Sequence, residues 1–218
     1  MERLTPVSER ILAQETFGSN LPRDAAEKGN MNELIGALFE ESIETKQRSR
    51  VLVDVVAASA RILIDALNAG HKVLVCGNGG SAADAQHFSG ELIGRFEKER
   101  AGLPCVALTT DSSVLTAWSN DYGYETVFSR QVAALGAPGD VLVGISTSGN
   151  SPNILEAMVE AGKKGMRRIA LTGRGGGKLK SMPEVCSIVV PSDVTSRIQE
   201  VHITIIHIWS RLIEDGCR

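Results

Sequence analysis

The pattern of apolar and polar positions changes twice in the first hundred residues, near residue 30 and after Gly70. Residues 1–30 mix charged and apolar positions, although SERILAQETF within them has the spacing of a short amphipathic helix. Over residues 31–69 apolar residues recur every three or four positions, which predicts two long helices ended by the C-cap signal Asn68-Ala69-Gly70. We therefore expect an N-terminal extension over residues 1–30 and a single domain over residues 31–218 that includes the helices at 31–69.

After Gly70 short apolar runs alternate with helical patterns. Runs that are apolar throughout are typical of parallel strands buried on both faces, and their alternation with helices is typical of a doubly wound sheet. The sequence thus predicts an α/β fold, a five-stranded parallel sheet flanked by helices and preceded by an N-terminal helical segment. The expected strands are residues 72–76, 104–109, 140–146, 167–172 and 186–190. The expected longer helices among them are residues 81–95, 112–118, 125–135, 152–163 and 196–214.

Composition narrows the possible partners. The 218 residues are 43% hydrophobic and 22% charged with a formal net charge of −3, which fits one globular domain and gives no basic surface for nucleic acid. No apolar run approaches the roughly 20 residues of a membrane span, and the first 30 residues hold no signal-peptide core. The four cysteines are far apart without a CxxC pair, so we expect reduced thiols in a cytoplasmic protein.

A glycine-rich turn follows the first expected strand. Gly77-Asn78-Gly79-Gly80-Ser81 would lie at the carboxyl end of the sheet, where the N-terminus of the next helix suits an anion. With Ala82 the turn also matches the dinucleotide pattern G-x-G-x-x-G/A, but the acidic residue expected about 20 positions later is missing. A nicotinamide dehydrogenase is therefore disfavoured, while a tight turn without a ligand stays open beside anion binding.

A second polar loop follows the third expected strand. In Ser146-Thr147-Ser148-Gly149-Asn150-Ser151-Pro152, Ser151 fits a helix N-cap and Pro152 the first helical position. Small hydroxyl side chains let a phosphate approach the backbone and still donate hydrogen bonds to it. The loop has no lysine, so it is not a nucleotide P-loop. Phosphate binding is the favoured interpretation, and a polar capped turn is the alternative.

Two helices carry candidate reactive groups. His87 and Glu91 are four residues apart and so lie on one helix face, as a surface pair, an acid/base group or metal ligands. The last helix is apolar around most of its circumference, which predicts burial. Gln199, His202 and His207 are embedded in it, either as satisfied core groups or as part of a site.

Four motifs together resemble one known family: CGNGGSAADAQHFSGEL, SNDYG, GISTSGNSPN and RIQEVHITIIH. In this order, over residues 31–218, the chain is similar to the SIS (sugar isomerase) superfamily and, within it, to the phosphoheptose isomerases. The resemblance implies an SIS-type doubly wound five-stranded parallel sheet and a homotetramer with sites at subunit interfaces. It does not extend to residues 1–30.

The resemblance also implies a role for each matching residue. Glu91 and His207 match the acid/base pair, and His87, Glu91, Gln199 and His207 match positions that hold a zinc ion in some members. Ser196 is a departure, because some members have Asp there, so any substrate contact from this position is not implied. The positions that match substrate-binding residues are Asn78, Gly79, Gly80, Ser81, Glu91, Asn120, Asp121, Ser146, Thr147, Ser148, Ser151 and Gln199.

The implied activity is conversion of sedoheptulose 7-phosphate to D-glycero-D-manno-heptose 7-phosphate through an enediol, as the first step of ADP-heptose synthesis for the lipopolysaccharide core or a related heptose. Such a reaction needs a base for the proton alpha to the carbonyl and an acid for the oxygens. Glu91 cannot be zinc ligand and free base at once, so a structural zinc and a carbonyl-polarising zinc both stay open. The alternative is a non-catalytic SIS protein that binds a sugar phosphate in regulation or replication. Proteins of that kind typically lack residues that match Glu91 and His207.

Overall fold

Residues 31–217 are described by the computed structural model, and the amphipathic helix expected within residues 1–30 lies outside them. A compact unit comprises Glu41–Arg218, and the described residues before it form the start of helix α3. The α-helices of the described chain are α3 (Met31–Arg48), α4 (Val53–Asn68), α5 (Gly80–Ile93), α6 (Ser112–Tyr122), α7 (Val127–Leu135), α8 (Pro152–Lys163), α9 (Gly177–Lys180) and α10 (Thr195–Gly216). The strands are β1 (Val73–Gly77), β2 (Cys105–Ala107), β3 (Val141–Ser146), β4 (Arg167–Thr172) and β5 (Val185–Val189).

The five strands are parallel, as the uniformly apolar runs predict. Their order in the sheet is β2-β1-β3-β4-β5. The chain leaves β1 in one direction along the sheet and β3 in the other, so the strand order reverses between these two neighbours. Gly77 at the end of β1 is in register with Ile145 near the end of β3. Loops that follow β1 and β3 therefore flank the switch point, which is where open α/β sheets bind ligands.

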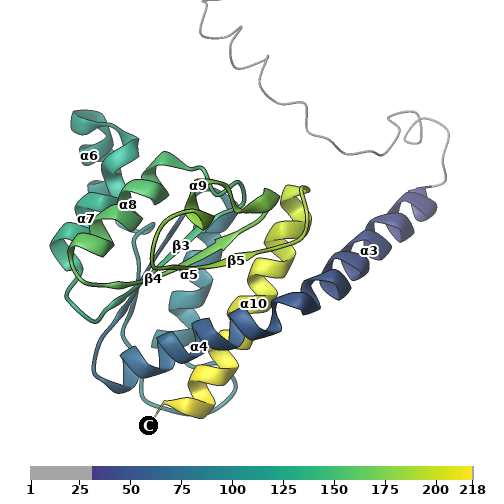
Figure 1. Ribbon diagram of the computed structural model, residues 1–218, viewed down its shortest axis with the longest axis horizontal. Helices are drawn as coiled ribbons and strands as arrows, with labels where there is room; N and C mark the ends of the chain where they lie inside the picture. Colours follow the sequence, from purple (N-terminus) through teal and green to yellow (C-terminus); the bar gives the residue numbers. More distant parts are fainter. Residues whose placement is uncertain (1–30, 218) are drawn as a thin grey trace, which may run out of the picture. The chain divides into compact units, whose positions relative to one another are not determined.

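Helices cover both faces of the sheet (Figure 1). Because successive side chains of a strand point to opposite faces, Val73 and Val75 pack in a core with α4, α5 and α10. Leu74 and Cys76 instead pack with α7, α8 and α9. This sorting places α5 and α10 in contact on one face of the sheet, and these two helices carry the predicted reactive groups.

Several boundaries differ from the expected ones. The two helices expected over 31–69 are joined by a 3-10 segment, Ser49–Leu52, and α6 continues to Tyr122. The edge strand β2 is short, and its Val106 is 39% exposed, whereas Cys105 and Ala107 on the opposite face of the same strand are buried. Burial on both faces thus holds for the inner strands β1 and β3 and not for this edge.

The four cysteines carry free thiols, as expected. Burial raises the pKa of the Cys76 and Cys105 thiols to about 12, so these two are inert core residues. Within residues 31–217, no helix combines the length and the apolar character needed to cross a bilayer.

Candidate functional site

The first predicted loop is a tight turn from β1 into α5. The backbone N–H of Ser81 donates to the Asn78 carbonyl at 2.9 Å, and Ala82 N–H donates to the Gly79 carbonyl at 3.0 Å. The Ser81 side chain is buried at the start of α5, as a residue facing the switch point should be. The turn therefore presents the N-terminus of a fourteen-residue helix to the carboxyl end of the sheet.

The second predicted loop gathers hydroxyl groups. Ser146 Oγ lies 2.8 Å from Ser151 Oγ and 3.5 Å from Ser148 Oγ. Pro152 is the first residue of α8, as expected, but the Ser151 side chain makes no cap hydrogen bond to this helix. Its hydroxyl turns to Ser146 instead, because that partner is buried beside it. The structure therefore confirms Ser151 as the N-cap residue, without a side-chain hydrogen bond to the helix.

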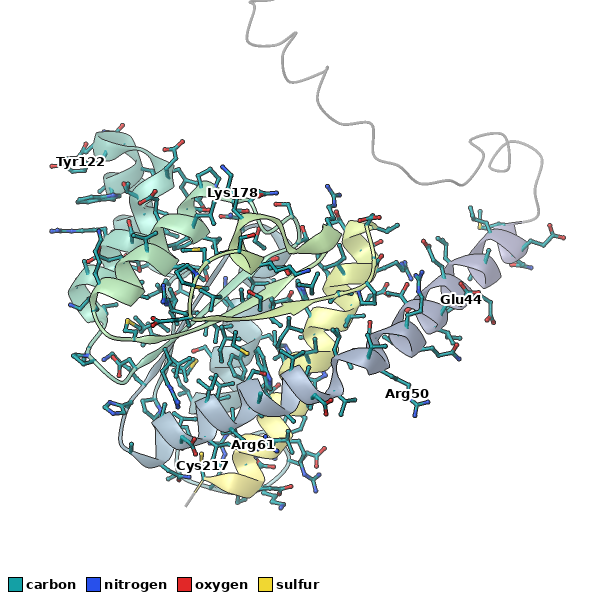
Figure 2. All side chains as sticks on the ribbon, in the orientation of Figure 1. Glu44, Arg50, Arg61, Tyr122, Lys178 and Cys217 are labelled. Carbon is teal, nitrogen blue, oxygen red and sulfur yellow. The ribbon has the colours of Figure 1, made fainter. Side chains whose placement is uncertain are left out.

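A third loop, residues 173–178, packs against the second loop and hydrogen-bonds to it. Gly173 N–H donates to the Thr147 carbonyl at 3.0 Å, and Lys178 N–H donates to Asn150 Oδ1 at 3.0 Å. Gly149 has a φ of +65°, and a Cβ there would lie 2.0 Å from the Gly176 carbonyl oxygen. The Lys178 side chain is exposed above these contacts (Figure 2). Glycine at position 149 thus allows the main chain of the third loop to pack directly against the hydroxyl loop.

Two residues that the sequence did not single out join the first loop to its surroundings. Asn78 Nδ2 donates to Asn153 Oδ1 at 3.0 Å, and Asn153 Nδ2 donates back to Asn78 Oδ1 at 2.8 Å. Tyr124 Oη donates to the same Asn78 oxygen at 3.1 Å. Since Asn153 is buried in the first turn of α8, this amide pair fixes the two loops to each other.

The predicted reactive groups meet between α5 and α10. His87 Nε2 is 3.0 Å from His207 Nε2 and 3.1 Å from Glu91 Oε1. One ligand atom from each of the three lies within 4.8 Å of the others. Gln199 lies against the start of α5, because a Cβ on Gly80 would come within 2.5 Å of Gln199 Nε2. His87, Glu91, Gln199 and His207 therefore line the contact of the two helices.

Three other polar groups have different surroundings. His202 is fully buried with Nε2 3.1 Å from the Thr172 carbonyl oxygen, and burial lowers its pKa to about 4. It is a core histidine, so only Gln199 and His207 of the three embedded polar groups face α5. Asn120 and Asp121 are exposed on α6 and hydrogen-bond each other at 2.9 Å. Tyr124 rather than these two residues provides the described hydrogen bond from this region to the first loop.

Asp84 is a further acidic group on α5 that sequence reasoning missed. It precedes His87 by three residues, so the two share a helix face. Burial raises the pKa of Asp84 to about 6, against a smaller lowering effect of His87. Within the described chain its Oδ2 is buried without a hydrogen-bond partner. Its spacing to His87 was the only signal in the sequence.

Known proteins share this fold and these motifs. The family model described as SIS domain matches residues 39–173. The phosphoheptose isomerase of Akkermansia muciniphila is 57% identical over 155 residues, which cover 71% of this chain and 82% of the relative. That of Campylobacter jejuni is 50% identical over 85% of this chain and 100% of its own length. The solved structure of the Neisseria gonorrhoeae phosphoheptose isomerase GmhA has a TM-score of 0.81 at 49% identity, covering 85% of this chain and all of that one.

The doubly wound sheet, the two loops at its switch point and these similarities define a protein of the SIS domain class. Within that class the chain belongs to the phosphoheptose isomerase family and is therefore an isomerase. The match spans 82% of the Akkermansia relative and the full length of the Campylobacter relative.

Proposed function

We propose that the chain interconverts sedoheptulose 7-phosphate and D-glycero-D-manno-heptose 7-phosphate. The observation that carries this proposal is the cluster of His87, Glu91 and His207 on helices that also border the polar loops. A proton-transfer site and a phosphate site joined by one helix suit a sugar phosphate whose carbonyl lies far from its phosphate.

The phosphate would be bound by the hydroxyl loop and the helix N-termini. Ser146, Ser148 and Ser151 lie within 3.5 Å of a neighbouring hydroxyl, so their O–H groups can turn together toward a phosphate oxygen. Ser81, Thr147 and the main chain of Asn78, Gly79 and Gly80 complete the proposed set. Binding energy from this distant group would fix the position of the reacting carbons.

The reacting end of the sugar would lie farther along α5. At about 1.5 Å per residue, His87 is about 10 Å along the helix axis from Gly80, which leaves room for an extended sugar. Glu91 would remove the proton from C1 of the open-chain ketose and return it to C2, with an enediol between the two steps. His207 would transfer protons between O1 and O2. Asn120, Asp121 and Gln199 are proposed to hold sugar hydroxyls.

The same cluster fits a zinc ion. Two imidazole nitrogens and one carboxylate within 4.8 Å of one another are a donor set that zinc takes in catalytic sites, and Gln199 is the proposed fourth residue. Glu91 would have to leave the zinc ion to act as the base, so a bound zinc would either be structural or polarise the substrate carbonyl. Elemental analysis of protein purified without chelator, followed by activity after metal removal, tests this part of the proposal.

The wider setting is also proposed. The product would enter ADP-heptose synthesis for the lipopolysaccharide core or a related heptose, in the cytoplasm, and the protein would act as a homotetramer. The retained pair Glu91 and His207 supports an enzyme over a non-catalytic sugar-phosphate-binding SIS protein.

Isomerisation in D₂O tests the enediol mechanism. An enediol intermediate lets the abstracted proton exchange with solvent, so the heptose 7-phosphate formed should carry deuterium at C2 by NMR. Turnover without any deuterium would contradict proton abstraction by Glu91, and binding of the sugar phosphate without turnover would contradict the proposed activity itself.

A further inference from the structure

The segment that joins α5 to β2 is anchored to α10 by a buried carboxylate. Glu214 Oε1 accepts hydrogen bonds from Phe96 N–H at 3.3 Å and Glu97 N–H at 3.2 Å, and Oε2 accepts from Glu97 N–H at 3.1 Å. Only 1% of the Glu214 side chain is exposed. Burial raises the pKa of Glu214, but hydrogen bonds from the backbone N–H groups of residues 96–98 and the charge of Arg100 lower it by more. The net result is a pKa below the ordinary value of a glutamate. The carboxylate is therefore an ionised anchor for this segment.

Arg100 connects the same anchor to the end of α5. Its guanidinium donates to the Glu91 carbonyl at 2.6 Å and to the Leu92 carbonyl at 2.8 Å. Its Nε lies 3.7 Å from Glu214 Oε1. A cation is favourable at a helix C-terminus, where carbonyl groups lack partners within the helix. Arg100 thus holds together the helix that carries Glu91 and the helix that carries His207.

The anchored segment places an aromatic ring on the reactive cluster. Phe96 is half-buried, and its ring centroid lies 5.8 Å from that of His207 with 28° between the planes. His207 precedes Glu214 by seven residues, which is about two turns, so both lie on one face of α10. Glu214 accepts a hydrogen bond from the backbone N–H of Phe96, and the Phe96 ring stacks on the imidazole of His207, two turns before Glu214 on α10.

We infer that Phe96 is a positioning residue for the isomerisation, held by Glu214 and Arg100. Its stacked ring restricts rotation of the His207 imidazole and leaves His207 Nε2 facing His87. The inference rests on the proposed function, in which His207 moves protons at the sugar oxygens. Phe96 itself has no group that could exchange a proton, so it acts only through the imidazole.

The variants Phe96→Ala, Phe96→Tyr and Lys98→Ala test this role. Because proton transfer is sensitive to displacements of about 1 Å, we expect kcat of Phe96→Ala to fall at least tenfold with KM for sedoheptulose 7-phosphate changed less than threefold. Phe96→Tyr keeps the stacked ring and should retain at least half of kcat. Lys98→Ala removes an exposed ion pair of the same segment with Asp215 and should match the wild type. A kcat of Phe96→Ala within twofold of the wild type, or a similar loss in Phe96→Tyr, would overturn the inference.

Crystal structures of the wild type and Phe96→Ala separate this inference from the proposed function. If the wild type does not isomerise the sugar, the proposed function fails, and the His207 ring position alone decides the inference. A displaced or rotated imidazole in a folded Phe96→Ala supports positioning by Phe96. An unchanged imidazole contradicts it. Glu214→Gln, which keeps the shape and loses the charge of the anchor, should displace Phe96 and His207 together.

Discussion

At the scale of single residues, the proposed proton transfer depends on Glu91. Its carboxylate lies 3.1 Å from His87, on the helix that starts at the first loop. Glu91→Gln keeps the shape and removes the base. We expect kcat to fall about 10²- to 10⁴-fold with a similar KM, measured with sedoheptulose 7-phosphate. Turnover equal to the wild type would remove Glu91 from the mechanism.

His202 should make stability depend on pH. Its folded-state pKa of about 4 is below the ordinary value of 6.5, so the unfolded chain binds the extra proton between these values. The contribution of neutral His202 to the free energy of unfolding is fully present above pH 6.5. It is lost as the pH falls toward 4, and the total loss is about 3 kcal/mol. In urea unfolding, His202→Gln should be less stable at pH 7 but should lose less stability between pH 6.5 and 4.5. Equal losses in both proteins would contradict this assignment.

Sequence reasoning named the residues that meet between α5 and α10 and missed the residues that hold the first loop in place. The spacing of His87 and Glu91 on one helix is visible along the chain, and the motif resemblance favoured His207 over His202 in the last helix. Asn153 and Tyr124 gave no such signal, because each meets Asn78 only after the chain has folded over the sheet. Long-range side-chain pairs of this kind have no local pattern.

At the scale of elements, the strands and helices followed the apolar pattern closely. β4 and α8 have the predicted limits, residues 167–172 and 152–163. The uniform burial of an inner strand makes its run apolar at every position, so its limits are visible in the sequence. The 3-10 segment at 49–52 was not predictable, because its side chains continue the helical period.

Glycine substitutions test the packing of loop 173–178 against the hydroxyl loop. In Gly149→Ala the methyl group would meet the Gly176 carbonyl at 2.0 Å in addition to the strain of a positive φ. We expect a raised KM for the sugar phosphate and a loss of stability above the 1–2 kcal/mol typical of such strain. Gly175→Ala is the matched control, because Gly175 has a φ of +74° and nothing within 4 Å of the added Cβ. Gly175→Ala should lose only the stability that the positive φ costs, with an unchanged KM. Equal KM values for the two variants would exclude a role of the Gly149–Gly176 contact in binding the sugar phosphate.

At the scale of the whole molecule, the doubly wound class was predicted but the strand order was not. Alternating strands and helices are compatible with several orders, and only the folded sheet places the loops after β1 and β3 side by side at the switch point. That adjacency brings the hydroxyl groups and the glycine turn to one site. The homotetramer remains a prediction.

The homotetramer should be visible in the mass of the protein in solution. Ile208 and Leu212, on one face of α10, are 42% and 39% exposed beside a groove that Val53 of α4 also lines. Apolar side chains grouped in this way favour burial by another subunit. Light scattering after gel filtration should give about four times 23.3 kDa, and Ile208→Asp should lower it. A monomer of the wild-type chain would contradict the prediction.

The central claim is that this site isomerises a seven-carbon sugar phosphate. The most direct measurement is a coupled assay of the wild-type protein with sedoheptulose 7-phosphate and, in parallel, fructose 6-phosphate. We predict formation of a heptose 7-phosphate aldose from the first sugar and much slower conversion of the second. No conversion of sedoheptulose 7-phosphate by folded protein, with zinc supplied, would contradict the proposed activity.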